Sequence, residues 1–334
     1  METSPQAGHV ARLLGAPPSL SHMQSQTPTI ADLLASGERP LHSFEFMPPR
    51  SEDDVYRLWS ATDALVPMAP DFISVTYGAN GSRRDRTLRC TQHMVSTGLR
   101  TVGHLTCVAQ SVADLEQMVA DYAESGVDHV LAIRGDMPGG AGLPWVPHPE
   151  GLPNATELVR LVKRIHPEAC IGVGAFPDGH PEARDIDLDA RILVDKAQAG
   201  ASFAITQLFF LPSHYQRLVE RVRGMGCDIP ITPGIMPITS YGQIRRFSEL
   251  AGTDVPAELV AQLEEAKGDK AAVRRIGLAA AVDMCCELLD AGAPGLHYYT
   301  LNRSRATTEL RTMLAQRRPE LAGLPREFEV SSAV

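Results

Sequence analysis

The sequence lacks an excess of positive charge, and this excludes two classes of partner. Lys and Arg total 31 of the 334 residues against 40 Asp and Glu, so the formal net charge is −9. Nucleic acids and anionic membrane surfaces attract proteins through clustered Lys and Arg side chains. We therefore expect the protein to bind neither nucleic acid nor a membrane.

Long apolar segments and patterned cysteines are also missing. No apolar run reaches the ~18 residues of a membrane-spanning helix, and the first 28 residues contain no continuous apolar stretch of the kind found in signal peptides. The six cysteines are scattered, without C-x-x-C or metal-ligand spacing. They are interpreted as reduced, mostly buried thiols, and no metal site is expected. The composition indicates a globular cytoplasmic enzyme or binding protein.

The sequence does contain a regular alternation of short β-rich runs and longer amphipathic segments. Apolar residues recur at helical spacing in these segments, as at Leu188, Ile192 and Leu193. Eight strands are predicted, at 41–46, 72–77, 101–107, 129–136, 170–177, 203–210, 230–237 and 296–302. Helices are predicted at 51–66, 114–124, 155–165, 187–199, 213–223 and 271–290.

Eight strands that each precede a helical segment predict an α/β fold, the (β/α)8 TIM barrel. An open doubly wound sheet also alternates, but neither G-x-G-x-x-G nor a P-loop motif is present. The long segment 238–294 is predicted to hold more than one helix, with a break at 253–256.

The chain is predicted to consist of one domain with two tails. Residues 1–28 mix Pro, Ser and Gln without sustained periodicity, which indicates a disordered or loosely docked N-terminal tail. Residues 29–320 would form the catalytic barrel, and residues 321–334 a C-terminal tail.

In a TIM barrel the active site lies at the carboxyl ends of the strands. The first predicted strand contains Glu45, and alternation places Ser43 on the same face. A carboxylate that points into a barrel mouth is partly desolvated, which favours the protonated form needed for donating a proton. A structural ion pair with an interior Arg or Lys is an equally weighted alternative.

Two strand ends carry features suited to ligand binding. The turn at 76–82 after the second strand contains small residues, which let backbone amides approach a ligand closely. Arg134, Gly135 and Asp136 follow the fourth strand. An Arg suits a phosphate and an Asp suits a ring N–H or hydroxyl group, although the two could instead pair and close the loop.

Further polar residues are predicted near the fifth to eighth strand ends. His180 could donate to a ligand oxygen, although a single histidine is more often structural. Gln207, Gln243 and Arg303 add hydrogen-bond donors. Together these groups predict a pocket for a large, polar, partly aromatic ligand.

Seven ordered blocks of the sequence resemble methylenetetrahydrofolate reductase. They are FEFMPPR (44–50), VTYGAN (75–80), HLTC (104–107), RGD (134–136), HPEA (180–183), AITQ (204–207) and YTLNR (299–303). The resemblance runs from about residue 41 to 315. Because the chain ends after the predicted barrel, it is similar to the bacterial form and not to the long eukaryotic form, which has a regulatory domain.

The resemblance implies a barrel that carries FAD, with NADH or NADPH as reductant and a reduced folate as substrate. In this family the flavin is reduced first, and 5,10-methylenetetrahydrofolate then receives the hydride and becomes 5-methyltetrahydrofolate. Glu45 matches the general acid that helps to protonate N10 of the folate, and Asp136 matches the carboxylate near the flavin and pterin. Family members form homo-oligomers, so the resemblance implies one here.

The binding residues that the resemblance implies fall into two groups. Folate contacts are matched by Asp136, Gln207, Gln243 and Arg303. Cofactor contacts are matched by Thr76, Tyr77, Ala79, His104, Arg134, Gly135, Asp136, Ala155, Phe176, His180, Ala183, Asp189 and Lys196, of which Thr76 matches a contact to the nicotinamide nucleotide.

The sequence departs from the family on the flavin side, at Phe176, Ile192 and Asp195. Phe176 lacks the hydroxyl of the Tyr found in many members, and a carboxylate beside Lys196 should weaken anion binding. The alternative is therefore a flavin-independent enzyme that transfers hydride directly from NADH to the folate, with Glu45 in the same role.

Two other classes of function are weighed against these. A barrel lyase or aldolase would need a Schiff-base lysine or a metal cluster at a strand end, and no predicted strand ends in either. A non-catalytic folate- or flavin-binding protein would be expected to lack the acid at position 45.

Overall fold

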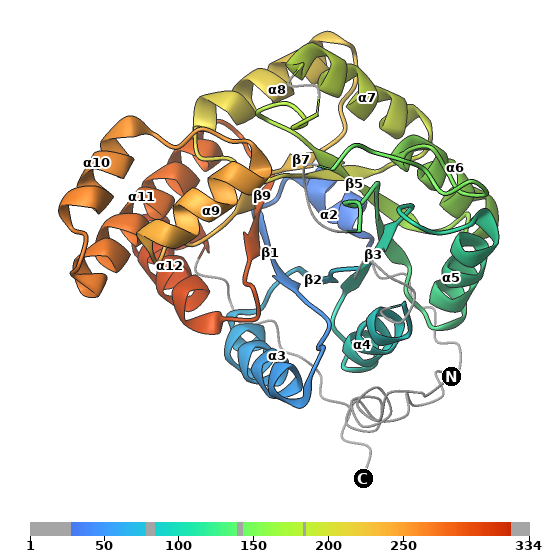
Figure 1. Cartoon of the computed structure of the whole chain (residues 1–334), viewed down its shortest axis with the longest axis horizontal. Coiled ribbons are helices and arrows are strands. Elements are labelled where there is room, and N and C mark those ends of the chain that lie inside the picture. The colour runs from blue at the N-terminus through green and yellow to red at the C-terminus, as the bar shows by residue number, and fades with distance from the viewer. Residues whose placement is uncertain (1–27, 78–83, 139–142, 183–184, 322–334) are drawn as a thin grey trace.

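The computed structural model describes residues 28–77, 84–138, 143–182 and 185–321 (Figure 1). The predicted tails 1–28 and 321–334 lie outside this part of the chain except for residues 28 and 321. One parallel sheet contains strands β1 (Leu41–Phe46), β2 (Phe72–Val75), β3 (Thr101–Thr106), β4 (His129–Ile133), β5 (Cys170–Ala175), β6 (Phe203–Thr206), β7 (Ile231–Thr232), β8 (Gly234–Ile235) and β9 (Gly295–Tyr299).

The sheet closes into a barrel through a seventh strand that is interrupted at Pro233. Its first half, β7, pairs with β6, and its second half, β8, pairs with β9. Proline has no N–H to donate to a neighbouring strand, but the Pro233 carbonyl accepts a hydrogen bond of 3.0 Å from the backbone N–H of His297. β7 and β8 both lie within the predicted run 230–237, so the prediction of an eight-membered α/β barrel is confirmed.

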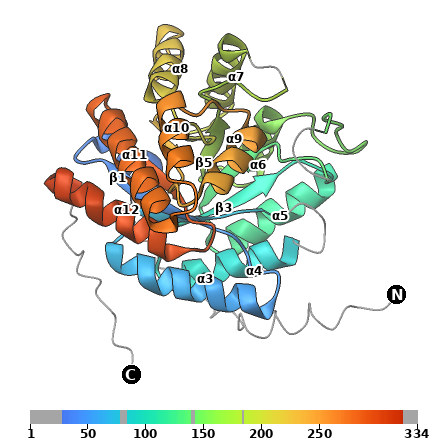
Figure 2. The same cartoon turned by 60° about the vertical axis from the view of Figure 1, so that its left-hand side comes forward.

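Eleven α-helices lie in the described residues and surround the strands (Figures 1 and 2). They are α2 (Ile30–Ser36), α3 (Glu52–Leu65), α4 (Arg84–Ser96), α5 (Val112–Glu124), α6 (Ala155–Ile165), α7 (Ile186–Gln198), α8 (Pro212–Gly224), α9 (Tyr241–Ala251), α10 (Ala257–Glu265), α11 (Lys270–Asp290) and α12 (Ser304–Arg317). The gap between α9 and α10 confirms the predicted break at 253–256. None of these helices is both long and apolar enough to cross a bilayer.

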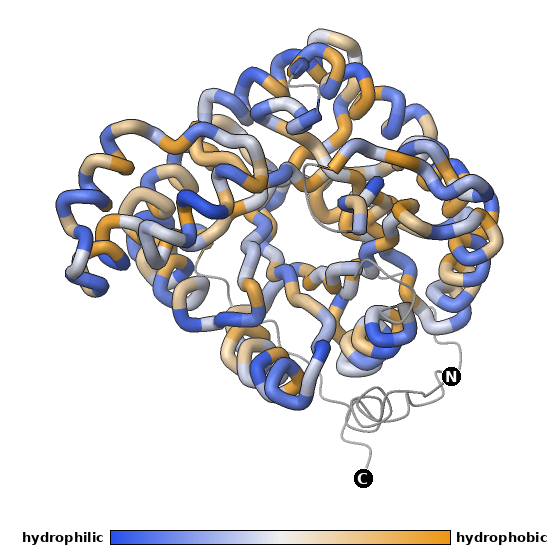
Figure 3. The backbone as a smooth tube through the Cα atoms, in the orientation of Figure 1, coloured by the Kyte–Doolittle hydropathy of each residue, from blue (hydrophilic) through white to orange (hydrophobic). Residues whose placement is uncertain are grey.

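Side-chain alternation along β1 separates the core from the barrel interior. Phe44 and Phe46 are fully buried and belong to the same cluster as Leu58 and Leu65 of α3. Ser43 and Glu45 therefore face the inside of the barrel, as predicted. The surrounding helices present hydrophobic and hydrophilic stretches side by side, as expected for amphipathic helices packed on a sheet (Figure 3).

The short helix α2 covers one end of the barrel, behind the strands in Figure 1. A capping box between Thr29 and Asp32 fixes its first turn. Its buried residues Ile30 and Leu34 pack in a cluster that includes Phe203, the first residue of β6, and the first residues of β1, β2 and β5. Because α2 covers the amino ends of the strands, the open mouth lies at their carboxyl ends.

Candidate active site

The described site residues lie at or beyond the carboxyl ends of the strands, or on the helices that follow. Ala79 and Ala183 fall outside the described residues. Two of them, Glu45 and His104, lie within β1 and β3. The loops that follow strands carry Thr76, Tyr77, Arg134, Gly135, Asp136, Phe176, His180 and Gln207. Helices carry the rest: Ala155 lies on α6, Asp189 and Lys196 on α7, Gln243 on α9, and Arg303 is the N-cap of α12. Their positions agree with the prediction of a site at the mouth, whereas their binding roles remain predictions.

Glu45 lies between two histidines inside the barrel. Its Oε2 atom is 3.8 Å from Nε2 of His104 and 3.7 Å from Nε2 of His297, and its side chain is 17% exposed. Within the described part of the chain, Glu45 lies beside these imidazoles and not beside the Arg or Lys of the structural alternative. Burial lowers the pKa of His104 to about 4, so this ring is neutral at pH 7.

His297 and Tyr299 complete the inner face of β9 beside Glu45. Nδ1 of His297 lies 2.7 Å from the hydroxyl of Ser43, and His297 is fully buried. The hydroxyl of Tyr299 donates to the carbonyl of Thr206 at 2.5 Å, and burial raises the pKa of Tyr299 well above 10. His297 and Tyr299 are not among the site residues predicted from the sequence, although the alternation that places Glu45 inside β1 also places them inside β9.

The segment after β9 holds the end of β1 in place. The side chain of Asn302 donates to the carbonyl of Met47 at 2.9 Å and accepts from its N–H at 2.8 Å. The hydroxyl of Thr300 donates to the carbonyl of Glu45 at 2.5 Å. These bonds join the strand of the acid to the segment that carries Arg303.

Arg134 is the centre of a polar cluster after β4. Its guanidinium group donates two hydrogen bonds to Glu182, of 2.7 and 2.8 Å, and lies 3.3 Å from Nε2 of His180. It also lies over the ring of Trp145, 4.8 Å from the centroid. Arg134 thus pairs with Glu182, whereas Asp136, its partner in the loop-closing alternative, is exposed. Glu182 and Trp145 were not selected from the sequence.

Glycine is the only residue type that fits at position 135, beside the side chains of Val108 and Thr106. Its φ of +84° lies in the left-handed region, and an added Cβ would lie 2.8 Å from the side chain of Val108 and 2.9 Å from that of Thr106. A glycine here lets the chain turn directly after β4.

A buried lysine lies on α7, close to the Arg134 cluster. Nζ of Lys196 donates to the carbonyl of Gly174 at 2.9 Å, and burial lowers its pKa to about 8. The neighbouring Asp195 is exposed, so the two side chains face different sides of the helix. Asp189, one turn from the start of α7, accepts a 2.6 Å hydrogen bond from the N–H of His180.

Of the three departures from the family pattern, Phe176 contacts His180 of the Arg134 cluster, and Ile192 and Asp195 lie on α7. The ring of Phe176 meets His180 edge-on, with a centroid distance of 4.8 Å. Ile192 is half-buried on α7. The cationic groups of Arg134 and Lys196 are nevertheless retained, and Nε of Arg134 is buried without a hydrogen-bond partner in the described structure.

The residues predicted to contact folate line the rim. Gln207 is exposed, and its side-chain oxygen accepts from the N–H of Leu208 at 2.8 Å. The Gln243 side chain accepts from the hydroxyl of Thr239 at 2.6 Å. Arg303 is exposed. Donors and acceptors from three neighbouring βα units thus follow the strands β6, β8 and β9.

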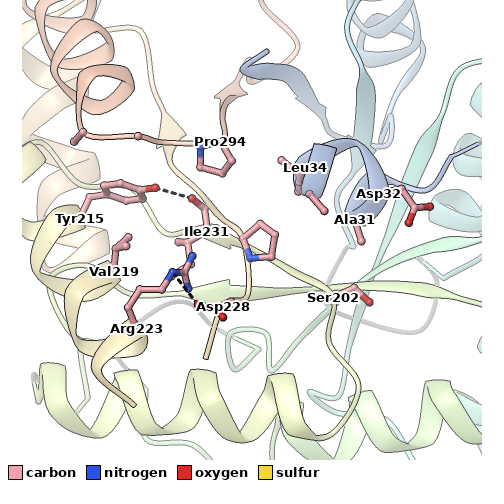
Figure 4. Close-up of a pocket in the computed structure, with 14 residues that line it drawn as sticks. Ala31, Asp32, Leu34, Ser202, Tyr215, Val219, Arg223, Asp228, Ile231 and Pro294 are labelled. Carbon is pink, nitrogen blue, oxygen red and sulfur yellow. Dashed lines mark hydrogen bonds and ion pairs between the residues drawn. The ribbon is translucent and has the colours of Figure 1, made fainter. Parts of the chain in front are cut away.

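A separate pocket of about 440 Å³ lies at the opposite end of the barrel, between α2 and α8 (Figure 4). Two of its polar side chains have protein partners: the hydroxyl of Tyr215 donates to the carbonyl of Ile231 at 2.8 Å, and Arg223 donates to the carbonyl of Ile229 at 3.0 Å. No group of three or more His, Cys, Asp or Glu in the described residues is placed to hold a metal ion.

Comparisons with known proteins agree with this architecture. The family described as "Methylenetetrahydrofolate reductase" matches residues 29–315. The "5,10-methylenetetrahydrofolate reductase" of Pectobacterium carotovorum subsp. carotovorum is 38% identical over 263 residues, covering 78% of this chain and 86% of that protein. The protein of the same name from Escherichia coli (strain K12) is 38% identical over 264 residues, with the same coverage.

Solved structures share the fold at low sequence identity. A protein from Clostridium thermocellum, described as binding two copies of 5-methyl-5,6,7,8-tetrahydrofolic acid, aligns with a TM-score of 0.64 and 13% identity over 87% of this chain and 99% of that chain. At this identity the likeness shows the fold alone.

Proposed function

The chain belongs to the methylenetetrahydrofolate reductase family, and we propose from this premise that it reduces 5,10-methylenetetrahydrofolate to 5-methyltetrahydrofolate with hydride from NADH or NADPH through bound FAD. The observation that carries the proposal is Glu45, which lies inside the barrel beside two imidazoles and faces the mouth.

Glu45 would act as the general acid at N10 of the folate. Opening the five-membered ring of the substrate breaks the bond between N10 and the methylene carbon, and a proton on N10 assists this step. The resulting 5-iminium carbon is the hydride acceptor. His104 is neutral at pH 7, so this ring places no positive charge beside Glu45.

The polar cluster after β4 and on α7 fits the phosphates of FAD. Arg134 and Lys196 supply cationic donors, His180 adds a ring nitrogen, and Gly135 gives room for the chain to approach a ligand. The unpartnered Nε of Arg134 is a donor that a bound phosphate would satisfy. When bound, FAD supplies a carrier that accepts hydride from the nicotinamide and delivers it to the folate.

The rim residues would orient the folate. Asp136, Gln207 and Gln243 offer acceptors and donors to the pterin, and Arg303 offers a positive charge to the glutamate carboxylates. The flavin-independent alternative uses the same acid and rim, and its support is the set of departures at Phe176, Ile192 and Asp195.

An absorbance spectrum of the purified protein, with and without added FAD, tests the route of the hydride. Bands at about 370 and 450 nm that are bleached by NADH and restored by methylenetetrahydrofolate are the expected result. A colourless protein that does not bind FAD, yet oxidises NADH when the folate is present, would replace the flavin route by direct transfer.

Replacing the acid tests the mechanism in either route. Glu45→Gln keeps the size of the side chain but removes the acidic proton, so we expect the rate of 5-methyltetrahydrofolate formation to fall by roughly 10²–10⁴-fold. NADH binding, followed by fluorescence, should be unchanged. Glu38→Gln, an exposed position before β1, is the matched control. A Glu45→Gln variant with wild-type turnover would remove Glu45 from the mechanism.

A further inference from the structure

We propose that His297, held by Ser43, is a positioning residue that orients the carboxyl group of Glu45 toward the folate. The inference rests on the proposed function and deepens it, because it names the residue that orients the general acid Glu45. His297 lies on β9 and Ser43 on β1, so the pair crosses between two neighbouring strands of the barrel.

The two carboxyl oxygens of Glu45 differ in their neighbours. Both imidazoles approach the same atom, Oε2, with Nε2 of His297 at 3.7 Å and Nε2 of His104 at 3.8 Å. Both Nε2 atoms are buried and have no hydrogen-bond partner in the described structure. Catalytic hydrogen bonds are often long before substrate binds, and a small rotation of the carboxyl group would bring Oε2 within bonding distance.

Ser43 determines which ring nitrogen of His297 can face Glu45 as a donor. The Ser43 hydroxyl lies 2.7 Å from Nδ1, and both residues are fully buried. When this hydroxyl donates to Nδ1, the ring hydrogen resides on Nε2 and points toward Oε2 of Glu45. The partnerless Nε2 and the nearby oxygen favour this tautomer, because it satisfies both groups.

The consequence is a carboxyl group with two distinct oxygens. Oε2 accepts from His297, so the acidic proton is carried by Oε1, the oxygen left for N10. The titratable groups that face Glu45 in the described structure are His104 from β3 and His297 and Tyr299 from β9. His104 is neutral at pH 7, and burial keeps Tyr299 protonated across the working pH range.

Three variants test the inference through steady-state kinetics with methylenetetrahydrofolate between pH 5 and 10. His297→Leu removes the donor, His297→Gln can keep an amide N–H near the position of Nε2, and Ser43→Ala removes the group that fixes the tautomer. Tyr298→Phe is the matched control, because it removes a hydroxyl from the same strand on the opposite face.

We expect His297→Leu to lower kcat roughly 10- to 100-fold, a part of the contribution of a general acid, with KM for the folate within about threefold of wild type. Loss of a donor to Oε2 destabilises the carboxylate, so the alkaline limb of the pH profile should move to higher pH. His297→Gln should retain most of kcat and the original limb, Ser43→Ala should show a smaller loss, and Tyr298→Phe should match wild type.

Equal losses in His297→Leu and His297→Gln with an unmoved alkaline limb would reveal a purely structural role and overturn the inference. Wild-type kinetics in His297→Leu would overturn it as well. If His297→Leu does not fold, Ser43→Ala takes its place. A loss of kcat with an unmoved alkaline limb, or wild-type kinetics, in Ser43→Ala would then overturn the inference. A wild-type protein that forms no 5-methyltetrahydrofolate would overturn the proposed function itself, which separates that failure from a failure of the His297 assignment.

Discussion

The guanidinium group of Arg134 is already paired with a carboxylate in this structure. Glu182 accepts two of its hydrogen bonds, and Trp145 covers its face. A phosphate group of FAD that binds Arg134 would have to compete with Glu182 for the same donors. Glu182 thus supplies the anionic partner of Arg134.

Glu182→Gln should therefore strengthen FAD binding. The change removes the competing charge but keeps the size of the side chain, and we expect Kd for FAD to fall about fivefold, the equivalent of about 1 kcal/mol. Titration followed by flavin fluorescence measures this effect. The matched control is Glu309→Gln, which removes an ion pair with Arg274 away from the mouth. Unchanged or weaker FAD binding in Glu182→Gln would show that Glu182 does not compete.

Lys196 is expected to lower the stability of the protein while serving the site. Its pKa is about 8 in the folded protein against the usual 10.5. Between these two values the unfolded chain holds a proton that the folded protein releases, so stability rises with pH across this window. Below pH 8 the full cost of burying the charge is present, about 3 kcal/mol at 1.36 kcal/mol per pKa unit.

Lys196→Met should raise the free energy of unfolding by about 1–3 kcal/mol at pH 7, since it removes the buried charge but also the bond to Gly174. The gain should shrink toward zero between pH 8 and 10.5, and FAD binding should weaken. Urea denaturation across this pH range is the measurement, with the exposed Lys270→Met as control. A gain that is independent of pH would contradict the assignment of the effect to titration of Lys196.

The positions of individual side chains could be predicted where the alternation within a single strand determines them. Alternation within β1 placed Ser43 and Glu45 inside the barrel. His297 could have been placed inside β9 in the same way, but its pairing with Ser43 joins residues 254 positions apart. Sequence periodicity reports which face a side chain occupies and gives no distance to a side chain on another strand.

At the scale of elements, the interrupted strand that closes the barrel depends on Gly234. A Cβ at this position would lie 2.6 Å from the ring of Tyr299 and 2.7 Å from the carbonyl of Thr206. The N–H of Gly234 also donates to the Thr206 hydroxyl at 2.9 Å. The small residue therefore lets β8 approach both β6 and the inner face of β9.

Gly234→Ala should destabilise the protein by about 2 kcal/mol or more, because backbone and a packed ring must move to admit one methyl group. Turnover should fall as well, since Tyr299 lies beside Glu45. Thermal unfolding and kcat are the readouts. Gly242→Ala is the control: it lies on α9 with open space around it and should be neutral or slightly stabilising. Equal behaviour of the two variants would refute the role of Gly234 in closure.

The elements themselves were largely predictable, with errors at the strand ends. The helix at 155–165 was predicted with its observed bounds, whereas the strands at 72–77 and 203–210 end earlier, at Val75 and Thr206. Except for Gln207, the extra residues are aromatic, apolar or β-branched, so they resemble strand residues, but they belong to the loops at the mouth. Helix α2 was not predicted, because its seven residues show too little periodicity and its packing partners come from distant strands.

At the scale of the whole molecule, the six cysteines report on global unfolding. Cys90, Cys107, Cys170 and Cys285 are buried, and Cys227 and Cys286 are partly exposed; all six are free thiols. Burial raises the pKa of Cys90 to about 12 and that of Cys107 to about 11. Reaction with a thiol reagent needs both access and the thiolate form.

We therefore expect Ellman's reagent at pH 8 to titrate at most two thiols rapidly in the native protein and all six in denaturant. The slow phase should follow the rate of unfolding. Cys286→Ser should remove one fast thiol, and Cys90→Ser should leave the fast phase unchanged. Rapid reaction of four or more thiols in the native protein would contradict the burial described above.

The overall architecture followed from the sequence because the βα alternation repeats along the whole chain and each unit contributes one strand. The assignment of individual side chains to cofactor or folate depended on the resemblance to a family, since polarity at a strand end does not distinguish one polar ligand from another.

The cover that α2 forms over the amino ends of the strands also bears on the order of folding. Ile30 and Leu34 leave the ribosome early, whereas Phe203 of the same cluster follows only after five strands and the helices between them have been made. Until β6 is in place, the apolar face of α2 lacks part of its native cover. This early helix therefore completes its packing late in synthesis, and the nascent chain carries an exposed apolar face for which a chaperone would compete.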